Sequence, residues 1–265
     1  MQIFFADMDG TLLNDQRQIT PRTQQAVQAF VDAGNSFVIS TGRPLESAVR
    51  AQERLGLKRP GSYVSAYNGA LIYDSYHEKT LYETGISLDL IPPLLALADT
   101  YHVHIQAFQK HYIVCRDHNS NLQYYRDRLR MPVIITDDML SELPQPPWKM
   151  LAIDIEGRTR LNKLRDAVNE ELGGLVRASY SNPYYLEIIP ANAGKGKSIV
   201  QLCQMLRIPV ENSLAAGDEE NDIPMLEAAG CGICMCNGKD AVKQVADVIT
   251  TEDNNHDGLV PFLVP

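Results

Sequence analysis

The sequence has little of three things that define particular protein classes: cysteine, positive charge and long hydrophobic runs. Its 5 cysteines among 265 residues are too few, and odd in number, for a disulfide framework, so reduced thiols are expected. Its 24 lysines and arginines against 33 acidic residues give a net charge of −9, which argues against nucleic acid or a membrane as partner. No apolar run approaches the roughly 18 residues that a membrane-spanning helix needs.

The amino terminus also lacks the pattern of an export signal. Residues 1–10 contain no basic stretch, and Asp7 interrupts their apolar run far short of a signal-peptide core. We therefore expect a cytoplasmic protein. A composition of 45% hydrophobic and 22% charged residues is ordinary for a globular chain and excludes disordered, collagen-like and coiled-coil classes. No pattern indicates an oligomeric state.

Both ends of the chain alternate predicted strands with predicted helices. Thr20 before Pro21 marks a helix start, and Gly34 marks its end. Expected strands lie at 3–8, 36–41, 63–67, 212–218 and 231–235, and expected helices at 21–33, 45–55, 196 onward, 224–229 and 239–246. This α/β alternation is typical of a parallel sheet.

The middle of the chain has a different pattern, in which extended runs follow one another as hairpin neighbours. The runs lie at 102–108, 111–116, 149–155, 175–180 and 184–189, with helical stretches at 119–129 and 159–172. An antiparallel sheet with helices is expected there. We therefore predict a discontinuous parallel-sheet core at 1–83 and 188–265, interrupted by an inserted α+β domain at 84–187.

The most informative motif is DMDGT at 7–11, which follows the first predicted strand. Ligands of open α/β sheets gather at the carboxyl ends of the strands, and Asp7 and Asp9 would lie there. Gly10 indicates that the chain turns and brings both carboxylates around one site. On this motif alone, a solvated acidic turn remains the alternative.

Three further segments are predicted at equivalent places. They are STGR at 40–43, Lys195 at a helix start, and GDEEND at 217–222. Together with DMDGT they supply a hydroxyl, a lysine and clustered carboxylates. That combination fits Mg²⁺-assisted phosphoryl transfer if the segments converge.

In this order, the motifs resemble the four motifs of the haloacid dehalogenase superfamily of phosphatases. Other segments are similar to its Cof-like branch, which includes sugar phosphatases and carries an inserted cap of the C2B type. They are YNGALIYD at 67–74, residues 186–200, residues 230–250 and NNHDGL at 254–259. The resemblance implies a Rossmann-like core with a central parallel sheet, plus an α+β cap that would choose the substrate.

The resemblance also implies roles for the residues. Asp7 would be the nucleophile that forms an aspartyl-phosphate, and Asp9 the general acid and base. Mg²⁺ would be bound by the Asp7 carboxylate, the Asp9 backbone carbonyl and Asp218. The phosphate would be held by Lys195, Thr41, Asn221 and the backbone amides near Met8 and Gly42. Asp222 would orient Lys195 or a metal-bound water.

The position of Arg43 leaves two roles open: contact with the substrate, or contact with a neighbouring carboxylate.

Taken together, the sequence resembles a Mg²⁺-dependent phosphomonoesterase acting on a small phosphorylated metabolite, such as a sugar phosphate or a phosphorylated cofactor. A phosphomutase that uses the same intermediate is the alternative. A phosphorylation-switched, receiver-like binding module is a further one.

Three other patterns favour structural interpretations. The segment ANAGKGKS at 191–198 nearly matches a P-loop, but Ala191 stands where its first glycine should be. Cys231, Cys234 and Cys236 fit the packing of a buried strand better than a metal site. His102 and His104 lack partners with the ligand spacing of a zinc site, and we expect them at an edge-strand surface.

Overall fold

The computed structural model describes residues 1–129 and 131–264, which form two compact units. The first unit comprises Met1–Tyr82 and the chain from Gly194 onward, and the second is Glu83–Ala193. The second unit thus continues beyond residue 187, where the sequence had placed its end. The reason is that β11 (Tyr185–Pro190) pairs along its length with a neighbouring strand of that unit.

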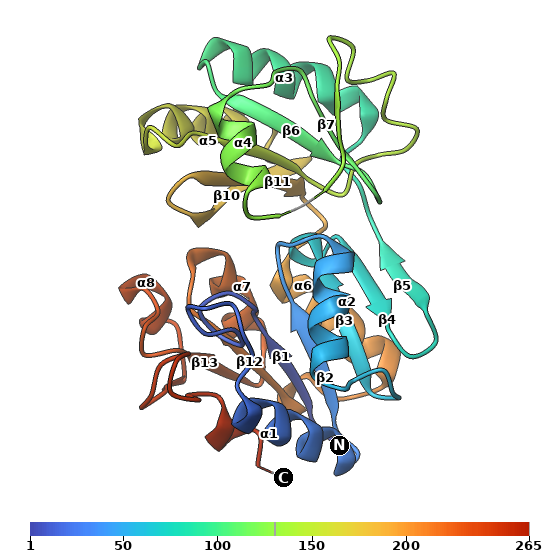
Figure 1. Ribbon diagram of the computed structural model, residues 1–265, viewed down its shortest axis with the longest axis vertical. Coiled ribbons are helices and arrows are strands. Elements are labelled where there is room, and N and C mark those ends of the chain that lie inside the picture. Colours follow the sequence, from blue (N-terminus) through green and yellow to red (C-terminus); the bar gives the residue numbers. More distant parts are fainter. Residues whose placement is uncertain (130, 265) are drawn as a thin grey trace. The chain divides into compact units, whose positions relative to one another are not determined.

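A sheet of eight strands forms the centre of the first unit, in the order β14-β13-β12-β1-β2-β3-β4-β5. Figure 1 labels the strands of this sheet from β13 to β5. From β14 to β3 all neighbours run parallel, and β4 is antiparallel to β3. The strands are β1 (Ile3–Ala6), β2 (Ser36–Ser40), β3 (Ser62–Ala66), β4 (Leu71–Asp74), β5 (Lys79–Glu83), β12 (Ser213–Gly217), β13 (Cys231–Cys234) and β14 (Val248–Ile249). The predicted parallel sheet is confirmed.

The helices of this unit lie between the strands in sequence. They are α1 (Pro21–Asp32), α2 (Leu45–Arg54), α6 (Lys195–Leu206), α7 (Ile223–Ala228) and α8 (Asp240–Lys243). Thr20 caps α1 as expected, because its hydroxyl accepts a hydrogen bond from the amide of Thr23 at 3.1 Å. The apolar face of α6 packs Ile199 and Leu202 into a buried cluster that includes Phe5 of β1.

The expected helix at 239–246 is shorter than predicted, because α8 ends at Lys243. The chain is drawn back to the sheet at Asp247, whose amide donates to the carbonyl of Gly232 at 2.8 Å. The Asp247 carboxylate in turn accepts from the amide of Gly232 at 2.7 Å. These two bonds align the chain for β14.

The second unit contains a six-stranded sheet in the order β10-β11-β9-β6-β7-β8. Its elements are α3 (Ile91–Thr100), β6 (His104–Phe108), β7 (Ile113–Cys115), α4 (Ser120–Arg126), β8 (Val133–Ile135), β9 (Met150–Ile153), α5 (Arg158–Leu172) and β10 (Val176–Asn182), besides β11. Neighbouring strands are antiparallel except β7 and β8, which are parallel. The α+β character of the insertion is confirmed.

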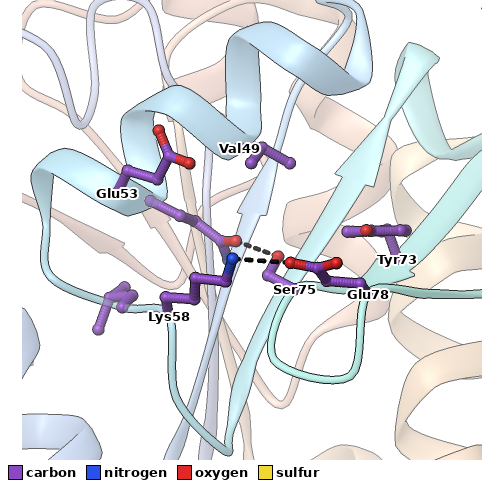
Figure 2. A pocket seen from close by; sticks show the side chains of 8 residues that line it. Val49, Glu53, Lys58, Tyr73, Ser75 and Glu78 are labelled. Atoms are coloured by element: carbon purple, nitrogen blue, oxygen red, sulfur yellow. Dashed lines mark hydrogen bonds and ion pairs between the residues drawn. The ribbon is translucent and has the colours of Figure 1, made fainter.

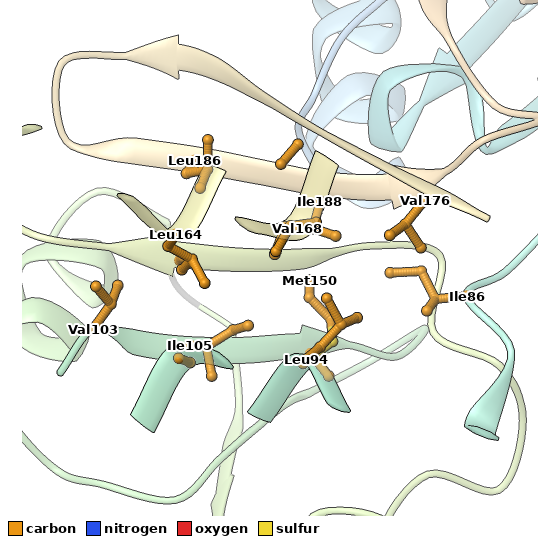
Figure 3. Close-up of a cluster of buried hydrophobic side chains, with 14 of the residues drawn as sticks. Ile86, Leu94, Val103, Ile105, Met150, Leu164, Val168, Val176, Leu186 and Ile188 are labelled. Atoms are coloured by element: carbon orange, nitrogen blue, oxygen red, sulfur yellow. The ribbon is translucent and has the colours of Figure 1, made fainter. Parts of the chain in front are cut away.

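The core of the second unit lies between this sheet and its helices. Leu94 of α3 and Leu164 of α5 meet Ile105, Met150 and Ile188 of the strands (Figure 3). Neither α3 nor β8 was expected from the sequence. No helix in the described parts of the chain is both long enough and apolar enough to cross a lipid bilayer.

The helix α3 forms despite two consecutive prolines. Pro92 and Pro93 lie in its first turn, where backbone N–H groups have no partner within the helix, so the prolines remove no hydrogen bond there.

Candidate catalytic site

The residues of the four sequence motifs meet at the carboxyl edge of the parallel sheet of the first unit. Asp7 follows β1, Thr41 follows β2 and Asp218 follows β12, while Lys195 is the first residue of α6. The strands are in register, since Ala6 pairs with both Ile39 and Ala216. The residues that follow these strands are therefore brought to one end of the sheet, as the sequence motifs required.

A buried ion triad is the centre of the site. The Nζ atom of Lys195 donates hydrogen bonds to Oδ1 of Asp7 and to Oδ1 of Asp222, each at 2.5 Å. Lys195 is 1% exposed. Burial alone would lower the pKa of Lys195, but the carboxylates of Asp222 and Asp7 raise it above its ordinary value. Lys195 is therefore a fixed positive charge beside the carboxylate of Asp7.

Asp222 uses both of its carboxylate oxygens within the protein. Besides the Lys195 contact of Oδ1, its Oδ2 accepts from the backbone amides of Asp218 and Glu219, each at 3.1 Å. A Cβ atom on Gly217 would lie 2.5 Å from the Cβ of Asp222, so only glycine permits this approach. Asp222 thus orients Lys195 and the loop that carries Asp218.

Asp218 is placed by the turn that follows Asp7. The hydroxyl of Thr11 donates to Oδ1 of Asp218 at 2.8 Å. Gly10 has a φ of 76° and touches the Asp218 carboxylate so closely that no side chain would fit. The sequence interpretation of Gly10 as a turn residue is borne out by this backbone conformation.

The carboxylates of the site are crowded. Burial, together with the nearby charges of Asp7 and Asp222, raises the pKa of Asp218 to about 9. Burial raises the pKa of Asp7 to about 7, against the opposing effect of Lys195. Repulsion of this kind is relieved when a cation lies among the carboxylates.

The donor set fits a hard divalent cation. One oxygen each of Asp7, Asp218 and Asp222 lies within 4.8 Å of the others, the sole such group of three found among the described residues. Because both oxygens of Asp222 are already engaged, Asp7 and Asp218 are the side chains that suit a metal. Each has its Oδ1 in a hydrogen bond to Lys195 or Thr11, and its Oδ2 in none of the bonds described.

Arg43 contacts a neighbouring carboxylate, one of the two roles that its position left open. Its Nε donates to Oδ2 of Asp9 at 2.8 Å, and its Nη2 donates to Oδ1 of Asp9 at 2.5 Å. Asp9 nevertheless keeps a half-exposed side chain. Both oxygens of the predicted acid and base are therefore held by one guanidinium group in this structure.

Three of the predicted phosphate-binding residues, Thr41, Gly42 and Asn221, contact Arg43 or Asn68. The hydroxyl of Thr41 accepts from the amide of Arg43 at 3.1 Å, and Gly42 leaves room for Asn68, which would lie 3.0 Å from a Cβ there. The carboxamide of Asn221 donates to Oδ1 of Asn68 at 3.2 Å.

Asn68 was not among the predicted residues, although it joins two of them. Its amide donates to the carbonyl of Thr41 at 2.9 Å, and its φ of 55° is left-handed, which asparagine tolerates. The signal that could have identified it is the Asn-Gly pair in the segment 67–74.

Met8, between the two aspartates, has a buried side chain, and its carbonyl accepts from the amide of Leu13 at 2.8 Å.

A separate pocket lies beside α2 and β4, away from these carboxylates. Figure 2 shows its lining, which includes Val49, Glu53, Lys58, Tyr73, Ser75 and Glu78. Lys58 pairs with Glu78 at 2.7 Å across it. The Lys58–Glu78 ion pair thus occupies this pocket, and none of the predicted site residues is among its lining.

The P-loop-like segment, the cysteines and His104 were the other patterns considered in the sequence, and none of them joins the carboxylate site as a separate ligand site. Lys195 in the P-loop-like segment binds carboxylates. Cys234 is buried in β13, whereas Cys236 lies beyond the end of that strand. The expectation of a surface position is wrong for His104, which is 6% exposed because it lies within the sheet of the second unit.

The haloacid dehalogenase-like hydrolase family is matched over residues 4–263. The chain is 30% identical over 268 residues to the 5-amino-6-(5-phospho-D-ribitylamino)uracil phosphatase YitU of Bacillus subtilis, covering 97% of this chain and 94% of that protein. It is 28% identical over 276 residues to the pyridoxal phosphate phosphatase YbhA of Escherichia coli, covering 99% and 97%.

Solved structures agree in fold. A haloacid dehalogenase-like hydrolase from Bacteroides thetaiotaomicron superposes with a TM-score of 0.87 at 27% identity, over 99% of this chain and 98% of that one. The similarity therefore extends over the whole length of both chains and includes both units.

Proposed function

The chain belongs to the haloacid dehalogenase-like hydrolase family, in its Cof-like branch, and we propose that this phosphomonoesterase uses Mg²⁺ and an aspartyl-phosphate on Asp7. The observation that carries the proposal is the buried contact of Lys195 with Asp7, beside Asp218. A carboxylate at the end of a strand, held by a fixed positive charge, is suited to nucleophilic attack on an anionic phosphate.

The first step transfers the phosphoryl group to the enzyme. A carboxylate oxygen of Asp7 forms a bond to phosphorus, and the ester P–O bond breaks. Asp9 gives its proton to the departing alkoxide, which leaves as an alcohol. Lys195, Thr41 and Asn221 would hold the phosphoryl oxygens, together with backbone amides near Met8 and Gly42.

The second step returns the enzyme to its starting state. Asp9, now ionised, takes a proton from a water molecule whose oxygen attacks phosphorus, and the bond to Asp7 breaks. Inorganic phosphate leaves. When bound by Asp7, Asp218 and the Asp9 carbonyl, Mg²⁺ would offset the repulsion between the anionic nucleophile and the anionic ester.

The contact of Asp9 with Arg43 sets a condition on this cycle. A carboxyl group that delivers a proton must turn one oxygen toward the leaving group as an O–H donor, whereas both oxygens of Asp9 here accept from one guanidinium. Arg43 must therefore release at least one oxygen of Asp9 before the first step.

The proposed substrates are small phosphorylated metabolites. The names of the two similar phosphatases specify a ribitylamino-uracil phosphate and pyridoxal phosphate, a sugar-alcohol phosphate and a phosphorylated cofactor. The net charge of −9 argues against nucleic acid and anionic membranes as partners.

The test is phosphate release from a panel of sugar phosphates and phosphorylated cofactors, assayed with Mg²⁺ or with EDTA. Asp7→Asn and EDTA should each abolish turnover, whereas Asp240→Asn, at an exposed helix start, should match the wild type. Undiminished activity in Asp7→Asn would refute the assignment of Asp7 as the nucleophile. Transfer of phosphate between hydroxyls, without release, would show a phosphomutase instead.

A further inference from the structure

The motif NNHDGL at 254–259 has no part in the mechanism above, yet it is hydrogen-bonded to the turn from Gly10 to Leu13, which follows Asp9. Asn254 is 7% exposed, and its Nδ2 donates to the carbonyl of Leu13 at 3.0 Å. The same Nδ2 lies 3.1 Å from Oδ1 of Asp15, a second acceptor. Asn254, more than 200 positions away in the sequence, therefore holds the carbonyl at the end of the turn from Gly10 to Leu13.

Asn237 holds the beginning of the same turn. Its Nδ2 donates to the carbonyl of Gly10 at 2.8 Å. Its Oδ1 accepts from the backbone amide of Asn254 at 3.3 Å. The two asparagines are thus joined to each other, and together they hold the carbonyls at both ends of the segment from Gly10 to Leu13.

The turn has few hydrogen bonds of its own with which to keep this shape. The amide of Leu13 donates to the carbonyl of Met8 at 2.8 Å, and that of Leu12 to the carbonyl of Asp7 at 3.2 Å. These bonds use the amides of the turn and the carbonyls before it. The carbonyls of Gly10 and Leu13 accept instead from the side chains of Asn237 and Asn254.

The segment that carries Asn254 is itself fixed to the protein on its other side. The carboxylate of Asp257 accepts from the hydroxyls of Thr20 and Thr23, at the start of α1. The segment that carries Asn254 is therefore also anchored at Asp257, and such a second attachment makes it a more rigid support.

We infer that Asn237 and Asn254 are positioning residues, which fix the turn from Gly10 to Leu13 and thereby set the Asp9 backbone carbonyl and the Thr11 hydroxyl that orients Asp218. This inference rests on the proposed function, because the Asp9 carbonyl and Asp218 are the proposed metal ligands. Outer contacts of this kind orient the ligands and tune metal affinity.

The experiment compares Asn237→Ala and Asn254→Ala with Asn255→Ala as the matched control. Asn255 is the neighbour of Asn254; it bonds the amide and carboxylate of Asp15 and, in a long contact of 3.5 Å, donates to Oδ1 of Asn254, but it bonds no carbonyl of the turn. For each protein, calorimetric titration gives the Mg²⁺ affinity, a melt without Mg²⁺ gives Tm, and phosphate release gives kcat and KM. Asn237 is exposed, so its substitution leaves the protein folded even if Asn254→Ala does not.

Each of the two variants should bind Mg²⁺ about 10-fold more weakly and lose about 10-fold in kcat at saturating Mg²⁺. The KM for the ester should stay within about twofold, since its phosphate contacts are made elsewhere. The double variant should be little worse than either single one, because both hold one turn. Asn255→Ala should match the wild type in all four quantities.

Two results would be distinguishable failures. Wild-type Mg²⁺ affinity and kcat in Asn237→Ala and Asn254→Ala, whatever their Tm, would overturn the inference and leave the proposed function intact. A wild-type protein that neither binds Mg²⁺ nor releases phosphate would instead overturn the proposed function.

Discussion

Replacing Lys195 by methionine (Lys195→Met) should strongly destabilise the first unit. The change removes the ammonium from between Asp7 and Asp222 and leaves two buried carboxylates without their counter-charge. Two opposite unit charges about 4 Å apart attract by about 4 kcal/mol at an effective dielectric constant of about 20. Removing one partner of a buried pair typically costs about 3–5 kcal/mol, and we expect a loss in that range.

The location of the single tryptophan allows the two units to be followed separately. Trp148 is buried in the second unit, so its fluorescence reports unfolding there, whereas far-UV circular dichroism reports both units. A loss of about 3–5 kcal/mol corresponds to a fall in Tm of roughly 6–20 °C in the dichroism transition of the first unit. Lys197→Met, on the exposed side of the same helix turn, is the control and should change stability by less than about 0.5 kcal/mol.

A companion variant tests the stated cause. In Asp7→Asn/Lys195→Met one of the two unpaired carboxylates is gone, so the double variant should be more stable than Lys195→Met alone. A Lys195→Met protein within about 1 kcal/mol of the wild type would refute the reasoning, because an uncompensated buried carboxylate pair cannot cost so little.

Three further predictions concern single groups. Ser40→Ala should raise Tm of the first unit, because the fully buried Ser40 hydroxyl has no partner among the described residues and such a group costs about 1–3 kcal/mol; an unchanged or lower Tm would contradict this. Burial lowers the pKa of His104 below its ordinary value of 6.5, and its Nδ1 lies 3.2 Å from the amide nitrogen of Asn119. Below pH 6.5 the unfolded chain therefore binds a proton at His104 more readily than the folded chain does. The contribution of the neutral, buried His104 to folding stability is complete above pH 6.5 and falls as the pH drops below it. Urea midpoints from tryptophan fluorescence at about pH 7.5 and about pH 5.5 should differ less in His104→Gln than in the wild type, and an equal difference would exclude His104 as the cause. Asp218→Asn should melt higher than the wild type without metal, because the cost of burying the Asp218 carboxylate, the main cause of its raised pKa, and its repulsion from Asp7 are both removed, and Mg²⁺ should no longer raise its Tm; a retained Mg²⁺ effect would show that the ion binds elsewhere.

Much of the fold follows from local patterns. Buried runs such as 36–41, and helix signals such as Thr20 before Pro21, depend on neighbouring residues, and the elements they predict are present. The helix α3 was missed because two prolines normally argue against a helix, although they are tolerated in a first turn. The end of α8 was misplaced because a pairing with Gly232, distant in sequence, ends it.

The sequence by itself determined which side chains stand at the ends of the parallel strands, because strand direction and motif order together bring Asp7, Thr41 and Asp218 to one edge. Only the tertiary structure decided how they are used. It assigns both oxygens of Asp222 to the protein, pairs Arg43 with Asp9, and joins Asn254 to the catalytic turn. Such contacts depend on the directions of side chains from segments far apart in the chain, and no local periodicity encodes those directions.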